Sequence, residues 1–186
     1  MLGAIVVDIV GSVYEFSNIK TKDFELFKPS CRYTDDTIMT CAVTDAIMNG
    51  GSESNFIRSK KYGRMYPHAG YGGRFRVWLR SMDTEPYNSF GNGAAMRVSP
   101  CAWVMDCGFC ARTGIWSSRD LARLSASITH NHPEGIKGAL AVCDAIFMAR
   151  FYSDECKRRM KEHIENEYGY DLSVSLDSIR KDYEFD

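Results

Sequence analysis

Residues 34–50 constrain the fold more than any other segment, because they carry the full pattern of a buried helix. Thr34-Asp35-Asp36-Thr37 supplies polar residues suited to a first turn, and Gly50-Gly51 supplies a stop. The residues between them are apolar at helical spacing. They are Ile38, Met39, Cys41, Ala42, Val43, Ala46, Ile47 and Met48. The sequence therefore predicts a core helix whose first turn bears two carboxylates.

Three further segments carry helical signals. Residues 117–120 resemble a capping box before a helical apolar stripe that ends near residue 130. Pro133 suits the first position of the next helix, and another helix is expected over residues 153–169. Residues 4–10 are rich in β-branched side chains and residues 171–176 alternate with period two, so their pattern leaves helix and strand open. Because the clear patterns are all helical and only these two segments are ambiguous, the sequence favours an all-α fold.

Length and charge indicate one domain without a polyanionic partner. No linker, repeat or composition break divides residues 1–186, so we expect a single domain. The 23 Lys and Arg against 24 Asp and Glu leave a net charge of -1, which argues against nucleic acid as a partner. The seven cysteines lack the spacing of a disulfide framework, which indicates reduced thiols. The apolar start contains Asp8 and is too short to span a bilayer, so we expect a cytoplasmic protein without a membrane anchor.

Two neighbouring carboxylates give the first candidate site. Asp35 and Asp36, flanked by the hydroxyl of Thr34, offer hard oxygen ligands that suit Mg²⁺, Mn²⁺ or Ca²⁺. The alternative interpretation is helix capping, because the same residue types satisfy free N–H groups at a helix start. Glu15 is a further acid, and its alternative is an exposed loop position.

Glycine-rich segments give the second candidate site. Bare backbone at residues 70–73 and 91–93 can bring N–H groups close to a phosphate, although ordinary turns have the same composition. Asn92, between two glycines, can bond a ligand hydroxyl or its own backbone. His130 and His132 stand at a corner between two predicted helices, without a third ligand at a familiar zinc spacing.

Five stretches, taken together and in order, resemble one protein family. They are residues 3–12 with 14–16, 33–39, 70–72, 89–97, and 130–134 with 138–139. This pattern is similar to that of the ADP-ribosylglycohydrolases, relatives of the dinitrogenase-reductase-activating glycohydrolase. The resemblance implies a bundle of mostly orthogonal helices around a cleft with two divalent cations, Mg²⁺ or Mn²⁺. It also implies an ADP-ribosylated protein or an ADP-ribose-containing small molecule as substrate.

The resemblance also implies roles for individual residues. Thr34, Asp35 and Asp36 match metal ligands, and Glu15 matches the acid that controls the metals and the substrate ribose. The residues that match the ADP-ribose-binding loops and pocket are Gly70, Gly72, Ser89, Phe90, Asn92 and His130. The implied reaction cleaves the N- or O-glycosidic bond between ADP-ribose and a side chain, with Asp35, Asp36 or Glu15 taking a proton from water.

Two departures from the family pattern bear on function. The usual Gly-Asp of the first motif is Val7-Asp8, and no late Gly-Gly-Asp-x-Asp-Thr motif follows Gly138. We therefore expect a C-terminally short fold that lacks half of the metal ligands. Three functions stay open: an ADP-ribosyl hydrolase or fragment of one, a non-catalytic ADP-ribose-binding module, and a structural relative. An apolar surface left without covering helices would favour self-association.

Overall fold

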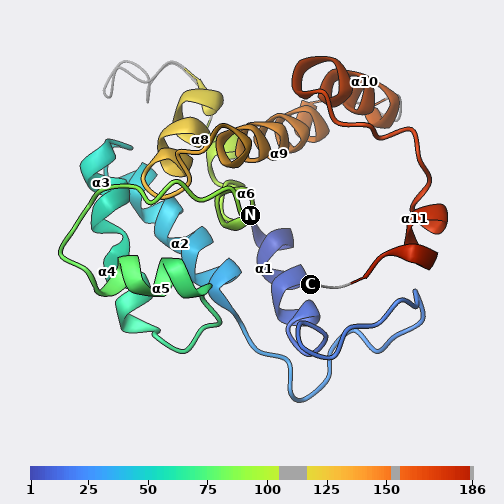
Figure 1. Cartoon of the computed structure of the whole chain (residues 1–186), viewed down its shortest axis with the longest axis horizontal. Coiled ribbons are helices and arrows are strands. Elements are labelled where there is room, and N and C mark those ends of the chain that lie inside the picture. The colour runs from blue at the N-terminus through green and yellow to red at the C-terminus, as the bar shows by residue number, and fades with distance from the viewer. Residues whose placement is uncertain (105–116, 152–155, 185–186) are drawn as a thin grey trace.

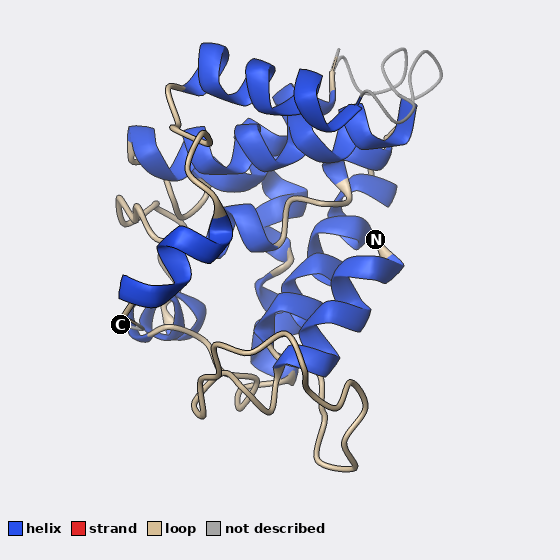
Figure 2. Cartoon of the chain, turned by 90° about the vertical axis from the view of Figure 1, so that its right-hand side faces the viewer, coloured by secondary structure: helices blue, strands red, loops and turns tan. Residues whose placement is uncertain are grey.

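Helices joined by loops form the whole of the computed structural model in the residues it describes, 1–104, 117–151 and 156–184 (Figures 1 and 2). No strand occurs within those ranges, which confirms the predicted all-α fold class. In chain order the elements are α1 (Leu2–Gly11), α2 (Asp35–Met48), α3 (Glu53–Arg58), α4 (Lys60–Met65), α5 (Gly73–Arg80), α6 (Gly93–Met96), η1 (Cys101–Trp103), α8 (Ser118–Ser127), α9 (Pro133–Phe151), α10 (Cys156–Tyr168) and α11 (Leu176–Asp182).

Helix α2 lies in the core, as its pattern predicts. Thr34 is the N-cap, and its hydroxyl accepts a hydrogen bond from the Asp36 N–H at 3.4 Å. Cys41 and Met48, two of the apolar positions in the predicted pattern, face solvent instead because they lie on the outer side of the helix. The buried positions are Ile38, Met39, Thr40, Ala42, Val43, Ala46 and Ile47.

Helix α9 carries much of the remaining core. It begins at Pro133, as predicted, and packs against α6, α8 and α10, while α8 is capped by the Ser117 hydroxyl. Figure 1 shows α9 and α2 running in different directions. The predicted start of the following helix at residues 153–155 lies outside the described residues, and that helix ends at Tyr168. Helix α6 contacts α2, α8 and α9 and therefore lies between them.

The two segments with ambiguous patterns contain no strand. Residues 4–10 lie within α1, and residues 171–175 form a loop that leads into α11. None of the residues of α1 is buried, and Leu2, Val6 and Val7 are exposed. A strongly apolar helix normally lies inside a protein, so this exposed face is the surface to which the expectation of self-association applies. Across the described part of the chain, no helix combines the length and apolar character that a membrane crossing requires.

A buried carboxylate links three of the packed helices. Asp144 of α9 accepts a hydrogen bond from the Tyr168 hydroxyl at 2.6 Å and lies 2.9 Å from His163 Nε2, both on α10. Arg119 of α8 places its Nε 3.6 Å from the same Asp144 oxygen. Arg119 also pairs with Glu167 at 2.6 Å. Asp144 is therefore the shared acceptor that holds α8, α9 and α10 together.

Replacing Asp144 with alanine is expected to lower the free energy of unfolding by about 2–3 kcal/mol, because the buried hydroxyl of Tyr168 loses its acceptor. Urea denaturation followed by circular dichroism measures this change. The matched control is Asp177→Ala, whose carboxylate forms an exposed ion pair with Lys22 and should change stability far less. Equal losses in the two variants would show that the shared acceptor is not what stabilises the packing.

Candidate active site

Asp8 fixes the start of α2 from the neighbouring helix α1. Its carboxylate accepts hydrogen bonds from the Thr34 N–H at 2.9 Å and the Thr34 hydroxyl at 2.5 Å. It also accepts from the Thr37 N–H at 3.2 Å and the Thr37 hydroxyl at 2.5 Å. The capping interpretation thus describes Thr34 and Asp8, and Asp35 and Asp36 follow in the first turn of α2.

Carboxylates gather in one hollow between α1 and the start of α2, which we call the acidic cleft. It has a volume of about 680 Å³, and its lining includes Asp8, Glu15, Thr34, Asp35 and Asp36. Burial, followed by the charge of Asp36, raises the pKa of Asp35 to about 7. Burial and the charge of Asp8 also raise the pKa values of Asp36 and Glu15. Acids that raise one another's pKa form a site that a cation would stabilise.

Gly70, which has no side chain, places its backbone next to the carboxylates of the acidic cleft. Its φ of +102° lies in the region that favours glycine, and an added Cβ would lie 3.3 Å from Asp35 Oδ1 and 3.7 Å from Glu15 Oε1. The adjoining Ala69 carbonyl accepts a hydrogen bond from the Asp35 N–H at 2.7 Å. A side chain at position 70 would be strained and would also occupy the cleft.

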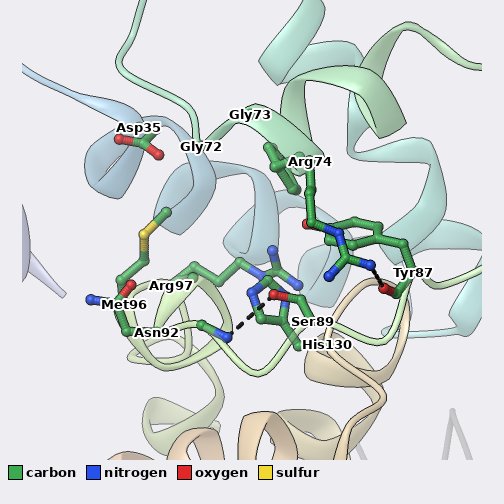
Figure 3. A pocket seen from close by; sticks show the side chains of 13 residues that line it. Asp35, Gly72, Gly73, Arg74, Tyr87, Ser89, Asn92, Met96, Arg97 and His130 are labelled. Carbon is green, nitrogen blue, oxygen red and sulfur yellow. Dashed lines mark hydrogen bonds between the residues drawn. The ribbon is translucent and has the colours of Figure 1, made fainter. Parts of the chain in front are cut away.

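A second hollow, the basic pocket, adjoins the acidic cleft. It has a volume of about 290 Å³ and contains two arginines, Arg74 and Arg97 (Figure 3). Figure 3 shows both guanidinium groups on the side of the pocket away from Asp35. The pocket is lined by Asp35, Gly72, Gly73, Arg74, Phe75, Tyr87, Ser89, Gly91, Asn92, Gly93, Met96, Arg97 and His130. Two cations against one lining carboxylate suit an anionic ligand.

Arg97 keeps its charge although it is only 1% exposed. Its Nη2 donates to the Ser125 carbonyl at 2.7 Å and to the Thr129 hydroxyl at 2.8 Å, both neutral acceptors. Burial lowers its pKa to about 10, which leaves it protonated at neutral pH. Burial also lowers the pKa of His130 to about 3, with further contributions from Arg97 and Arg74, so that imidazole is neutral.

The loop over residues 88–92 is held in place by polar contacts and by close packing. The Asn88 N–H donates to Asn131 Oδ1 at 2.8 Å, and the Gly91 N–H donates to the Ser89 hydroxyl at 3.3 Å. Gly135, in the first turn of α9, lies so near that an added Cβ would be 2.7 Å from the Ser89 carbonyl oxygen. The loop therefore keeps its position because α9 presents no side chain there.

Comparison with known proteins places the chain in a family. The protein-family model described as ADP-ribosylglycohydrolase matches residues 1–181. The chain belongs to the ADP-ribosylglycohydrolase family. Its curated relatives include "ADP-ribosylhydrolase ARH3" from Mus musculus, 27% identical over 182 aligned positions that cover 80% of this chain and 47% of the relative. The proteins of that name from Homo sapiens and Bos taurus are 25% and 29% identical and are covered over 56% and 48% of their length. The chain thus spans about half the length of the curated relatives it matches.

Most of the residues predicted from the ADP-ribosylglycohydrolase pattern lie around these two hollows. Glu15, Thr34, Asp36 and Gly70 line the acidic cleft, and Ser89 and His130 line the basic pocket. Three of the predicted residues, together with Met96, line both hollows: Asp35, Gly72 and Asn92. The roles assigned to these residues stay predictions.

Phe90 does not join the other predicted residues. Its side chain is 70% exposed and lies outside both linings, with its ring 5.6 Å from that of His132. Sequence reasoning missed Arg74, Arg97 and Gly135 as parts of this candidate site. Arg97 lies in the matched stretch 89–97, but its sequence context gives no sign that it is buried without an acidic partner.

Proposed function

We propose that this chain binds ADP-ribose and acts in the hydrolysis of the N- or O-glycosidic bond that joins it to a modified side chain. The observation that carries the proposal is the basic pocket beside the acidic cleft, joined through Asp35, Gly72 and Asn92. ADP-ribose pairs an anionic diphosphate with a ribose whose anomeric carbon becomes positively charged in an oxocarbenium-like transition state. The two hollows match those two charges in adjacent positions.

The diphosphate would lie in the basic pocket. Arg74 and Arg97 supply positive charge, and the backbone of Gly72, Gly73 and Gly93 allows close approach to phosphate oxygens. Neutral His130 offers a ring face or a nitrogen to the remainder of the ligand without adding charge. Charge from arginine is independent of pH in the physiological range, so binding does not depend on a titrating group.

A divalent cation fits the acidic cleft by the chemistry of its donors. Asp35 and Asp36 would contribute carboxylate oxygens to Mg²⁺ or Mn²⁺. Within the described residues, however, no three His, Cys, Asp or Glu side chains are grouped closely enough to hold a metal ion on their own. Further ligands would therefore come from water, from substrate hydroxyls or from another part of a longer protein.

The carboxylates of the acidic cleft would move the protons of the reaction. Water attacks the anomeric carbon, the bond to the side-chain nitrogen or oxygen breaks, and that atom leaves with a proton. Asp35, Asp36 or Glu15 takes the proton that the attacking water loses and passes it to the departing nitrogen or oxygen. When bound, a divalent cation supplies positive charge that lowers the pKa of such a water.

A second candidate function is ADP-ribose binding without turnover. It is favoured by the incomplete ligand set of the acidic cleft, since the basic pocket does not depend on those ligands. Calorimetric titration with ADP-ribose, with and without Mg²⁺, tests binding. Release of ADP-ribose from one peptide modified at arginine and another modified at serine tests hydrolysis. Binding without release supports the second function, and neither binding nor release would exclude both.

The clustered acids of the acidic cleft predict that the free energy of unfolding falls as pH rises. A divalent cation should offset that fall. Because the pKa of Asp35 is about 7 in the folded chain against 3.8 as its ordinary value, folding favours its protonated form. Its contribution to the free energy of unfolding therefore decreases as pH rises from about 4 to about 7. The raised pKa values of Asp36 and Glu15 act in the same direction.

Thermal unfolding with a chelator should accordingly give a melting temperature that falls over this range. Millimolar Mg²⁺ or Mn²⁺ should restore it most strongly above pH 7, where the acids are ionised and free to bind. Asp35→Asn is the matched variant, and its melting temperature should vary less with pH. A pH profile identical to that of the wild type would contradict the assignment to Asp35.

A further inference from the structure

A third hollow, the flanking pocket, lies beside the acidic cleft and has no role in the proposed function. Its volume is about 400 Å³. The residues that line it and enter the argument are Arg32, Tyr33, Met65, Tyr66, His68 and Ala69. Most of these side chains are exposed, so the pocket is open to solvent.

Two chain segments place the flanking pocket next to the acids. Along the first, Arg32 and Tyr33 line the flanking pocket, and the next residues, Thr34 to Asp36, line the acidic cleft. Along the second, Ala69 lines the flanking pocket, Gly70 the acidic cleft, and Gly73 the basic pocket. The hydrogen bond from the Asp35 N–H to the Ala69 carbonyl, 2.7 Å long, joins the segments. Along the second segment, the acidic cleft lies between the other two hollows.

The flanking pocket combines an apolar, aromatic surface with the positive charge of Arg32. The rings of Tyr33 and Tyr66 meet edge to face with centroids 5.9 Å apart, and Met65 is exposed beside them. Arg32 is anchored by its N–H, which donates to the Ser12 hydroxyl at 3.0 Å. Its guanidinium makes no hydrogen bond or ion pair to the described residues, and its charge acts on Glu15 across the boundary with the acidic cleft.

We propose that the flanking pocket binds the polypeptide next to the modified residue of an ADP-ribosylated protein and prefers an acidic side chain there. This inference rests on the proposed function, which puts the reacting bond in the acidic cleft and ADP-ribose in the basic pocket. The modified side chain, on the other side of the glycosidic bond from ADP-ribose, then leads its polypeptide into the flanking pocket. Arg32 complements one carboxylate, and the Tyr33–Tyr66 pair packs against apolar peptide atoms.

A nucleic acid substrate matches this pocket less well. Its many phosphates would lie beside Asp8, Glu15, Asp35 and Asp36 in the neighbouring cleft, and the chain has a net charge of -1. A peptide can place a single carboxylate at Arg32 and keep the rest of its atoms neutral.

The test uses two ADP-ribosylated peptides that differ only in the residues flanking the modified side chain, glutamate in one and glutamine in the other. The wild-type chain should favour the glutamate peptide about fivefold in kcat/KM, or in Kd by fluorescence anisotropy if no turnover occurs. Arg32→Gln should bring that ratio close to one. Arg58→Gln, which removes an exposed charge at the end of α3 outside all three hollows, should keep the fivefold preference.

The outcomes separate this inference from the proposed function. Equal use of the two peptides by the wild type, or a preference that survives in Arg32→Gln, overturns the inference and leaves the hydrolase proposal standing. An ADP-ribosylated oligonucleotide that is bound or cleaved better than the glutamate peptide also overturns it. If neither peptide is bound or cleaved, the proposed function fails and the inference fails with it.

Discussion

Replacing Asp36 with alanine is expected to lower the rate of ADP-ribose release by about 10²- to 10⁴-fold and to leave the chain folded. The loss follows because the acidic cleft would lose both a candidate metal ligand and a candidate proton acceptor. Stability should be unchanged or higher, since burial and the charges of Asp8 and Glu15 already disfavour the ionised form of Asp36. Single-turnover release and thermal unfolding measure the two effects separately.

The control for this variant lies on the same helix. Asp45 belongs to α2 but pairs with Lys61 at 3.0 Å, outside the acidic cleft, so Asp45→Ala should retain the wild-type rate. An unchanged rate in Asp36→Ala would rule out the role that we propose for this carboxylate. A loss of rate accompanied by a large fall in melting temperature would indicate that Asp36 acts through the fold.

Replacing Arg97 with methionine is expected to weaken ADP-ribose binding on the order of 100-fold, because a buried charge facing the diphosphate would be removed. Calorimetry measures the affinity, and circular dichroism checks that the helix content of the chain is unchanged. Binding by the wild type should also weaken as salt rises, whereas the variant should respond less to salt.

Arg74→Gln provides a second variant at a position that is exposed, so folding is less at risk. It should weaken binding in the same direction by a smaller factor, since solvent screens its charge. Arg76→Gln on the same helix, whose guanidinium donates to the Tyr71 carbonyl outside the basic pocket, is the matched control. Wild-type affinity in both Arg97→Met and Arg74→Gln would exclude the basic pocket as the diphosphate site.

The helices were predictable where local chemistry and burial agree. At α2 and α9 the start residues, Thr34 and Pro133, coincide with apolar spacing that matches a buried stripe. At α1 the β-branched residues favour a strand by propensity, yet the segment is helical. No strand pairs with this segment in the described residues, so its backbone N–H and C=O groups bond to one another within a helix, and residue-by-residue propensity does not contain that information.

The candidate site was predictable in its acids and glycines and less so in its cations. Asp35 and Asp36 adjoin each other in sequence, so their shared cleft follows from the helix start alone. The buried guanidinium of Arg97 is held by Ser125 and Thr129, which are distant in sequence and supply neutral acceptors. A balanced total charge conceals such a residue, because composition does not record which charges are buried without a counterion.

The contact between Gly135 and the Ser89 carbonyl gives a criterion for sorting relatives by sequence alone. Any larger residue at position 135 must displace either the 88–92 loop or the first turn of α9, since an added Cβ would meet a backbone atom at 2.7 Å and backbone cannot rotate away. A relative that keeps the acidic motif but carries a side chain at this position should therefore hold its nucleotide differently. Position 135, which lines neither hollow, thus marks which members can hold the 88–92 loop in this position.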